Sequence, residues 1–322
     1  MTTAHTDLPS SPYFRLEQLG DHAWLAIATP GSGALGNAGI VDLGGATLIF
    51  DTMMTLSAAR DLRAAAEALT RRAPRYVVNS HFHLDHTTGN EVFDTATIIS
   101  STQTAPLIAE RSGETLREMQ ANGAEIIASE RAGLATITDP ALRLEAEQQV
   151  SDFAAMIAEV KGMRLRLPDI TFEPRMAIQG AERQARLMTW GGGHTPSDVV
   201  MCLPDERVLF AGDLIFSRMH PSIFAGDAPE WLRILGEMGK LDIDIVAPGH
   251  GAVATRAAIA EQREYLETVM ALAREAAEAG KTADEVAATP IPERYRDWGF
   301  ASGFARTMSV LLAYHQRAGE GA

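Results

Sequence analysis

Residues 79–90 read Asn-Ser-His-Phe-His-Leu-Asp-His-Thr-Thr-Gly-Asn, and half of the first eight side chains are imidazoles or carboxylates. A short apolar run ends at the first of these residues, which predicts a buried strand leading directly into a loop. On such a loop His81 and His83 can face the same side and share a metal ion, whereas Asp85 and His86 can turn toward a second ion. Imidazole and carboxylate ligands suit zinc, and also iron or manganese. The segment therefore predicts a metal site.

Three further segments carry the same residue types at similar places in the chain. His194 lies in a glycine-rich loop at 190–198, Asp213 follows an apolar run as Ala-Gly-Asp, and His250 follows another as Pro-Gly-His-Gly. Each lies at the predicted carboxyl end of a strand, where open α/β sheets form their clefts. Alone, each residue would be interpreted as an ordinary turn or surface residue. In these motifs, and together with the histidine-rich loop, a ligand role is favoured.

The rest of the chain alternates short apolar runs with amphipathic stretches, which predicts an α/β fold. Gly44-Gly45 between two apolar runs predicts a hairpin. Expected strands are 14–19, 23–28, 37–41, 46–50, 75–79, 96–100, 170–178, 184–190, 198–203, 207–211 and 243–247. Expected helices outside the insertion described next are 56–70, 229–240, 254–279 and 307–316.

The predicted domain organisation is a flexible polar tail at 1–11 followed by a single domain at 12–322. Within that domain we expect a helical insertion at about 103–166, rich in Ala, Glu, Leu, Met and Arg, and C-terminal helices at about 254–317. Gly113, Asn122-Gly123 and Asp139-Pro140 predict breaks in the helices of the insertion.

In chain order, the motifs His-x-His-x-Asp-His, Gly-His-Thr, Ala-Gly-Asp and Pro-Gly-His-Gly resemble those of the metallo-β-lactamase superfamily, over roughly residues 20–255. The resemblance implies an αβ/βα sandwich, in which two packed β-sheets carry helices on both outer faces. It also implies two metal sites that share one ligand. Metal 1 would be held by His81, His83 and His194, metal 2 by Asp85, His86 and His250, and Asp213 would bridge both.

Two divalent ions close together lower the pKa of a shared water, which gives a bridging hydroxide at neutral pH. Such a site hydrolyses activated acyl bonds: lactones, thioesters, other esters or β-lactams. Asp85 can also orient the nucleophile, so Asp85 and Asp213 are the candidate catalytic residues. The expected cofactor is a pair of Zn²⁺ ions, with iron or manganese as alternatives.

Other residues near these motifs allow two interpretations each. Asp198 either holds a ligand histidine in place or only begins the next strand. Arg218 and His220 follow the bridging aspartate within one loop length, so each is either a substrate contact or an ordinary loop residue. Cys202 lies in an apolar run and is expected to be a buried small hydrophobe. No motif includes the three histidines expected at the surface, which are His5, His22 and His315.

Asp213 distinguishes this chain from the true β-lactamases, which carry cysteine or serine at that position. The chain looks more like the glyoxalase II, lactonase and thioesterase branches, and the segments at 37–41, 204–213 and 248–251 look like polyketide cyclase/thioesterase relatives. Phe216 stands where quorum lactonases often carry tyrosine, which weakens the lactonase interpretation.

Two alternatives to a hydrolase remain open. One is a mononuclear iron enzyme that resembles the sulfur dioxygenases, and the other is a non-catalytic metal-binding protein. Both usually carry fewer ligands, so the complete set of seven counts against them.

The composition limits the class of partner. The 322 residues have a formal net charge of -14, and 46% are hydrophobic. An acidic chain without a basic stripe argues against nucleic acid, including a tRNA substrate, so a small-molecule substrate is expected. No apolar run approaches the ~18 residues of a membrane span, and the first residues do not form a signal peptide. Together with a single cysteine, this predicts a cytoplasmic protein, and the long C-terminal helix can form a homodimer face.

Overall fold

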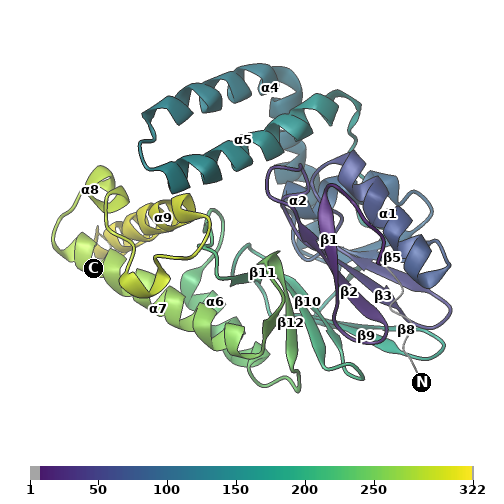
Figure 1. The fold of residues 1–322 in the computed structure, drawn as a ribbon. Helices are drawn as coiled ribbons and strands as arrows, with labels where there is room; N and C mark the ends of the chain where they lie inside the picture. Colours follow the sequence, from purple (N-terminus) through teal and green to yellow (C-terminus); the bar gives the residue numbers. More distant parts are fainter. Residues whose placement is uncertain (1–7, 321–322) are drawn as a thin grey trace.

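The computed structural model describes residues 8–320, which form two β-sheets packed face to face with helices outside them (Figure 1). This is the αβ/βα sandwich expected from the motifs. Most of the predicted tail at 1–11, including His5, lies outside the described residues. Among the residues described, no helix combines the length and the apolar character needed to cross a lipid bilayer.

The first sheet has seven strands in chain order, antiparallel from β1 to β4 and parallel from β4 to β7. Its strands are β1 Phe14–Gln18, β2 Ala23–Ala28, β3 Ala38–Asp42, β4 Thr47–Phe50, β5 Pro74–Val78, β6 Thr97–Ser101 and β7 Ile170–Phe172. The turn from β3 to β4 contains Gly44 and Gly45, both at positive φ, so the predicted hairpin is confirmed. Helix α1 (Leu56–Thr70) connects β4 to β5 with the predicted bounds.

The second sheet has six strands in the order β13-β12-β11-β10-β9-β8. Its strands are β8 Arg175–Gln179, β9 Gln184–Thr189, β10 Val199–Leu203, β11 Val208–Ser217, β12 Ile245–Gly251 and β13 Ala254–Thr255. Helix α6 (Ala228–Met238) connects the parallel strands β11 and β12. After β13 come α7 (Ala257–Glu278), α8 (Ala283–Ala287) and α9 (Ala301–Glu320).

The two sheets share a buried apolar core. Phe50 of β4 and Phe210 of β11 meet in it with ring centroids 5.7 Å apart. Separate apolar layers lie outside the sheets: α1 packs on the outer face of the first sheet, and α6, α7 and α9 pack on the second. The core therefore fixes the two sheets face to face, and their ends meet where the histidine-rich loop emerges.

The predicted strand at 170–178 is wrong, because this segment forms two strands in different sheets. β7 pairs with β6 in the first sheet and β8 pairs with β9 in the second. Pro174 lies between them and has no N–H to continue a ladder. The short apolar runs on its two sides therefore end one sheet and begin the other.

The insertion is helical, as predicted, and Figure 1 shows its two long helices, α4 (Gly113–Gly133) and α5 (Pro140–Glu159), side by side above the rest of the molecule. The predicted break at Asp139-Pro140 is confirmed, since the Asp139 side chain caps α5 by accepting N–H bonds from its first turn. The predicted break at 122–123 is wrong. A Cβ at Gly123 would lie 2.5 Å from Ile157 of α5, so this glycine allows two helices to approach rather than ending one.

Candidate metal centre

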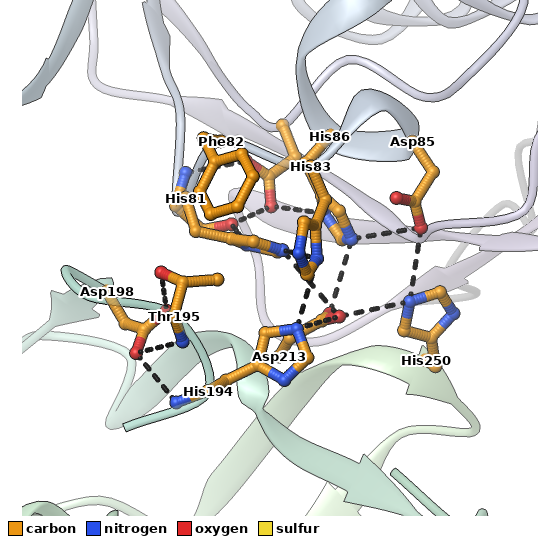
Figure 2. Close-up of polar contacts among 12 residues, drawn as sticks. His81, Phe82, His83, Asp85, His86, His194, Thr195, Asp198, Asp213 and His250 are labelled. Atoms are coloured by element: carbon orange, nitrogen blue, oxygen red, sulfur yellow. Dashed lines mark hydrogen bonds and ion pairs between the residues drawn. The ribbon is translucent and has the colours of Figure 1, made fainter. Parts of the chain in front are cut away.

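The seven residues predicted as ligands converge at the end of the sandwich where strands of both sheets stop or bend (Figure 2). The first sheet supplies the loop after β5 and the short helix α2 (Leu84–Thr87) that follows it. The second sheet supplies the loop after β9 and strands β11 and β12. The converging residues are His81, His83, Asp85, His86, His194, Asp213 and His250.

Four of these residues form a first group, in which three imidazoles face one carboxylate. Nδ1 of His83 lies 2.9 Å from Nε2 of His81 and 3.2 Å from Nε2 of His194. Oδ2 of Asp213 lies 3.3 Å from Nε2 of His194 and 3.8 Å from Nε2 of His81. All four ligand atoms lie within 4.8 Å of one another.

The other three residues form a second group around Asp85. Oδ2 of Asp85 lies 3.2 Å from Nε2 of His86 and 3.3 Å from Nε2 of His250. Asp213 also reaches this group, with Oδ1 3.3 Å from Nε2 of His86 and Oδ2 3.3 Å from Nε2 of His250. Asp213 therefore lies between the two groups and contacts histidines of both.

Asp213 occupies a different place in its strand from the one predicted. β11 does not stop at residue 211 but continues to Ser217, with register irregularities on both sides of Gly212, which has φ +52°. The irregularity turns the carboxylate out of the regular strand pattern. β12 comes so close that a Cβ at Gly249 would lie 2.0 Å from Oδ1 of Asp213, which explains the glycine before His250.

The donor atoms suit a divalent cation. Nε2 of His86 and Oδ1 of Asp213 are buried and face each other at 3.3 Å, yet neither makes a hydrogen bond within the part of the chain that the structure describes. Leaving buried polar atoms unpaired is costly, and a cation between the facing nitrogens and oxygens removes that cost. Nitrogen and carboxylate oxygen are also the donors that zinc and related metals prefer. These residues therefore fit divalent metal binding.

The charges of the site lead to the same conclusion. Burial lowers the pKa of His81 and His83, and it lowers that of His194 to about 3, so these imidazoles are neutral and free to act as ligands. Burial alone would raise the pKa of Asp85 and of Asp213, but the neighbouring histidines hold both well below the usual value. Burial lowers the pKa of His86 and His250, but the carboxylates outweigh it, raising that of His86 well above the usual value and that of His250 to about 10. The positive charge that the two buried carboxylates require therefore falls on these two imidazoles, and a bound divalent cation would supply it in their place.

Asp51 also contributes to this site, and sequence reasoning missed it. It directly follows β4 and is fully buried at φ 62°. Its Oδ2 lies 2.9 Å from Nδ1 of His86 and accepts the Ser80 hydroxyl at 2.7 Å, while Oδ1 accepts the Ser80 N–H at 2.7 Å. Asp51 therefore orients His86 through Nδ1, the ring nitrogen opposite the one that faces Asp85 and Asp213. An acidic residue at the carboxyl end of an apolar strand was the available signal.

Asp198 holds the loop that carries His194. Directly before β10, its Oδ2 accepts the backbone N–H groups of Gly193 at 2.8 Å and of His194 at 2.9 Å. Its Oδ1 accepts the Thr195 hydroxyl at 2.7 Å. Burial raises the pKa of Asp198 to about 7. Asp198 therefore both begins the approach to β10 and holds the backbone of the predicted ligand His194. Its carboxylate makes none of its described hydrogen bonds to the His194 ring.

A cavity of about 850 Å³ opens directly onto the two groups, and its lining includes His83, Asp85, His194, Asp213 and His250. The structure brings neither Arg218 nor His220 to this cavity. The lining residues do not include them, Arg218 being exposed at the surface and His220 fully buried.

His220 lies in an aromatic cluster. Its Nδ1 is 3.0 Å from the Tyr265 hydroxyl, and its ring packs against those of Tyr265, Trp298 and Phe304. His22 and His315, which were expected at the surface, are both partly exposed. Cys202 is buried and unpaired in β10, as predicted.

Comparison with known proteins gives one family. The family model described as the metallo-beta-lactamase superfamily matches residues 31–250. A solved metallo-beta-lactamase from Pontibacter korlensis is 17% identical with a TM-score of 0.57, covering 79% of this chain and 99% of its own. One from Hirschia baltica is 15% identical with a TM-score of 0.56, covering 79% and 97%. The DIM-1 metallo-beta-lactamase is 17% identical with a TM-score of 0.57, covering 80% and 98%. At these identities the solved structures establish the shared fold.

Proposed function

Because the chain belongs to the metallo-beta-lactamase superfamily, we propose that it is a binuclear metal-dependent hydrolase that cleaves an activated acyl bond. One observation supports the binuclear form above all others: the seven donor residues fall into two groups, and Asp213 contacts both. A site for a single ion would not need the second cluster of Asp85, His86 and His250.

The two groups have separate roles in this proposal. His81, His83 and His194 would hold one divalent ion, Asp85, His86 and His250 the other, and Asp213 would contact both. Such ions, Zn²⁺ in the first place, supply Lewis acidity toward a carbonyl oxygen and lower the pKa of water. Asp85 has Oδ2 directed at His86 and His250 and borders the cavity, so Oδ1 can accept a proton from the attacking water.

Further side chains position these groups. Asp51 fixes the ring of His86, and Asp198 fixes the backbone at His194. Phe216 stacks on the ring of His250 with centroids 5.1 Å apart, which leaves that imidazole a single direction toward the site. A substrate in the cavity would therefore meet rigid donors on one side and apolar walls on the other.

The central test combines elemental analysis of the purified protein with a panel of lactone, thioester, ester and β-lactam substrates. We expect about two divalent ions per chain and turnover of at least one class. One iron per chain with oxygen consumption on a persulfide would indicate the dioxygenase alternative. Bound metal without turnover of any activated acyl compound would indicate a non-catalytic protein. A cyclase/thioesterase-like activity would appear as preference for the thioesters.

The first prediction concerns His83, whose Nδ1 contacts two other histidines of its group. The change His83→Ala should abolish turnover and lower the metal content, because the first group loses its central donor. Elemental analysis and the substrate panel measure both. Cys202→Ser is the control and should change neither. Near-normal activity of His83→Ala would mean that the site is placed wrongly.

A further inference from the structure

We propose that the substrate carries a bulky, neutral, apolar acyl group, which binds in the cavity that borders the two groups of donor residues (the metal groups). This inference rests on the hydrolase function proposed above. It assigns the substrate class and the segments of the chain that select it.

The walls nearest the metal groups are apolar. Met54, Phe82 and Phe216 are buried and line the cavity beside His83 and His250. A cavity of about 850 Å³ is near the upper end of the range for small-molecule sites, roughly 300–1,000 Å³. An acyl group of one or two carbons would leave most of this volume to water in contact with apolar side chains, which is unfavourable.

The helical insertion forms the opposite wall. Met119 of α4 and Phe153 and Leu144 of α5 line the cavity, and Phe224 and Phe300 line it from the second half of the chain. These five side chains come from segments far apart in sequence, yet all are apolar and border one space. A wall of this kind recognises size and shape rather than charge.

The charged residues of the lining already have partners or lie at the surface. Asp152 accepts the backbone N–H groups of Gly31 and Gly33, at 3.0 and 2.6 Å. Glu145 accepts the Gln149 amide N–H at 3.4 Å, and the backbone at 300–302 opposes the rise in its pKa caused by burial. The exposed Arg15 pairs with Glu17, and the exposed Arg306 lies over the Phe224 ring. Among the described lining residues, the only carboxylates without such partners are those of the metal groups.

Two exposed apolar side chains lie at the mouth of the cavity, one of them beside Arg306. Leu144 is 57% exposed and Phe224 is 61% exposed, and both line the cavity. Single exposed apolar side chains are ordinary, but here two of them border one opening into an apolar space. We infer that an apolar group passes between them and covers them on binding.

The acyl-length dependence of turnover tests this inference. p-Nitrophenyl acetate, butyrate, hexanoate and octanoate are compared below their micelle concentrations, with the metal-loaded protein. Full burial of one methylene gives about a fourfold gain, and acetate and octanoate differ by about six methylenes. If three or four of the six are buried, kcat/KM should rise by about 100-fold from acetate to octanoate. The mono-p-nitrophenyl ester of adipic acid matches the hexanoate in length but ends in a carboxylate. It should react about tenfold more slowly or worse, because its charge must be desolvated.

Two lysine substitutions on helix α5 locate the effect. Leu144→Lys places a charge in the mouth, whereas Leu142→Lys adds the same charge at a residue that is 44% exposed and outside the lining. Leu144→Lys should lower the ratio of kcat/KM for the octanoate to that for the acetate about tenfold. Leu142→Lys should leave this ratio unchanged. Equal effects of the two variants would overturn the assignment of the mouth.

The inference and the hydrolase function can fail separately. Acetate hydrolysed as efficiently as octanoate would overturn the inference while leaving the function intact. If no ester reacts, a binding measurement still tests the inference. Isothermal titration calorimetry with octanamide, and with acetamide as the control, measures binding of a neutral apolar chain without turnover. Octanamide binding that Leu144→Lys weakens would support the inference even then. Absence of octanamide binding would overturn it.

Discussion

At the scale of single residues, Asp51 shows how a side chain outside the ligand set can control the site. Its carboxylate lies 2.9 Å from Nδ1 of His86, the nitrogen opposite the one that faces the second metal group. An acceptor at this nitrogen fixes the tautomer and the direction of the ring and increases the basicity of the other nitrogen. Burial raises the pKa of Asp51, while His86 opposes that rise.

The variant Asp51→Asn keeps the size of the side chain and tolerates the positive φ, but it loses the carboxylate. We expect metal affinity to fall about 10–100-fold, and metal loss on titration with a chelator measures it. Asp42→Asn, at the end of the neighbouring strand β3, is the matched control and should bind metal normally. Unchanged affinity in Asp51→Asn would show that His86 does not depend on this contact.

His220 gives a prediction for stability rather than activity. Burial lowers its pKa to about 4, compared with 6.5 for a free histidine. As the pH falls below about 6.5, the unfolded chain takes up a proton that the folded protein does not, so the free energy of unfolding decreases down to about pH 4. The total contribution is about 3 kcal/mol. In His220→Phe, the loss of stability between these pH values should be smaller by that order, as measured by urea unfolding. Parallel pH curves for the variant and the parent would contradict this account.

At the scale of elements, helix α5 joins the insertion to the rest of the molecule through carboxylates seven residues apart. Glu145 lies beside the backbone N–H groups at 300–302, which oppose the rise in its pKa caused by burial. Asp152 accepts the N–H groups of Gly31 and Gly33, and Glu159 accepts the Ser57 N–H at 3.2 Å. A spacing of seven residues places side chains on one face of a helix, with a drift of about 20° per step. One face of α5 is thus tied to three separate segments around the cavity.

The variant Asp152→Asn should loosen the middle of this face. Asparagine can place an N–H group toward the glycine N–H groups and loses the charge that they stabilise, so a charged hydrogen bond is weakened. We expect faster hydrogen exchange in α4 and α5 with little change in the sheets. Glu147→Gln on the same helix, where the carboxylate pairs only with the exposed Arg143, is the control. Exchange that is uniform over the whole chain would indicate general destabilisation instead.

The elements also show what sequence could and could not predict. The amphipathic pattern predicted α1 with its observed bounds, and four ligand motifs predicted residues that the fold brings together. The segment at 170–178 was misassigned because local pattern does not reveal which sheet a strand joins. Asp51 was missed because one acidic residue after a strand is not a motif. The position of His220 depends on aromatic rings at 265–304, which spacing does not relate to it.

At the scale of the whole molecule, both metal groups combine residues of the two sheets. His81, His83, Asp85 and His86 belong to the first half of the sandwich, and His194, Asp213 and His250 to the second. The chain itself connects the halves here through the Ser80 carbonyl, which accepts the Val199 N–H at 2.8 Å, and through Asn37, which donates to the Pro248 and Gly251 carbonyls. Bound ions would therefore act as cross-links between the sheets as well as in catalysis.

Removal of metal should accordingly lower the stability of the entire fold. Ions that bind the folded chain alone stabilise it by RT ln(1 + [M]/Kd), about 2.7 kcal/mol for each site at a hundredfold excess over Kd. Dialysis against a chelator should therefore lower Tm, and added Zn²⁺ should restore it with a dependence on concentration. His83→Ala should reduce this dependence, since it disrupts one group. If chelation removed the metal and left Tm unchanged in the parent protein, the ions would not join the two sheets, and the donors would have to be positioned fully by hydrogen bonds such as those of Asn37 and Asp198.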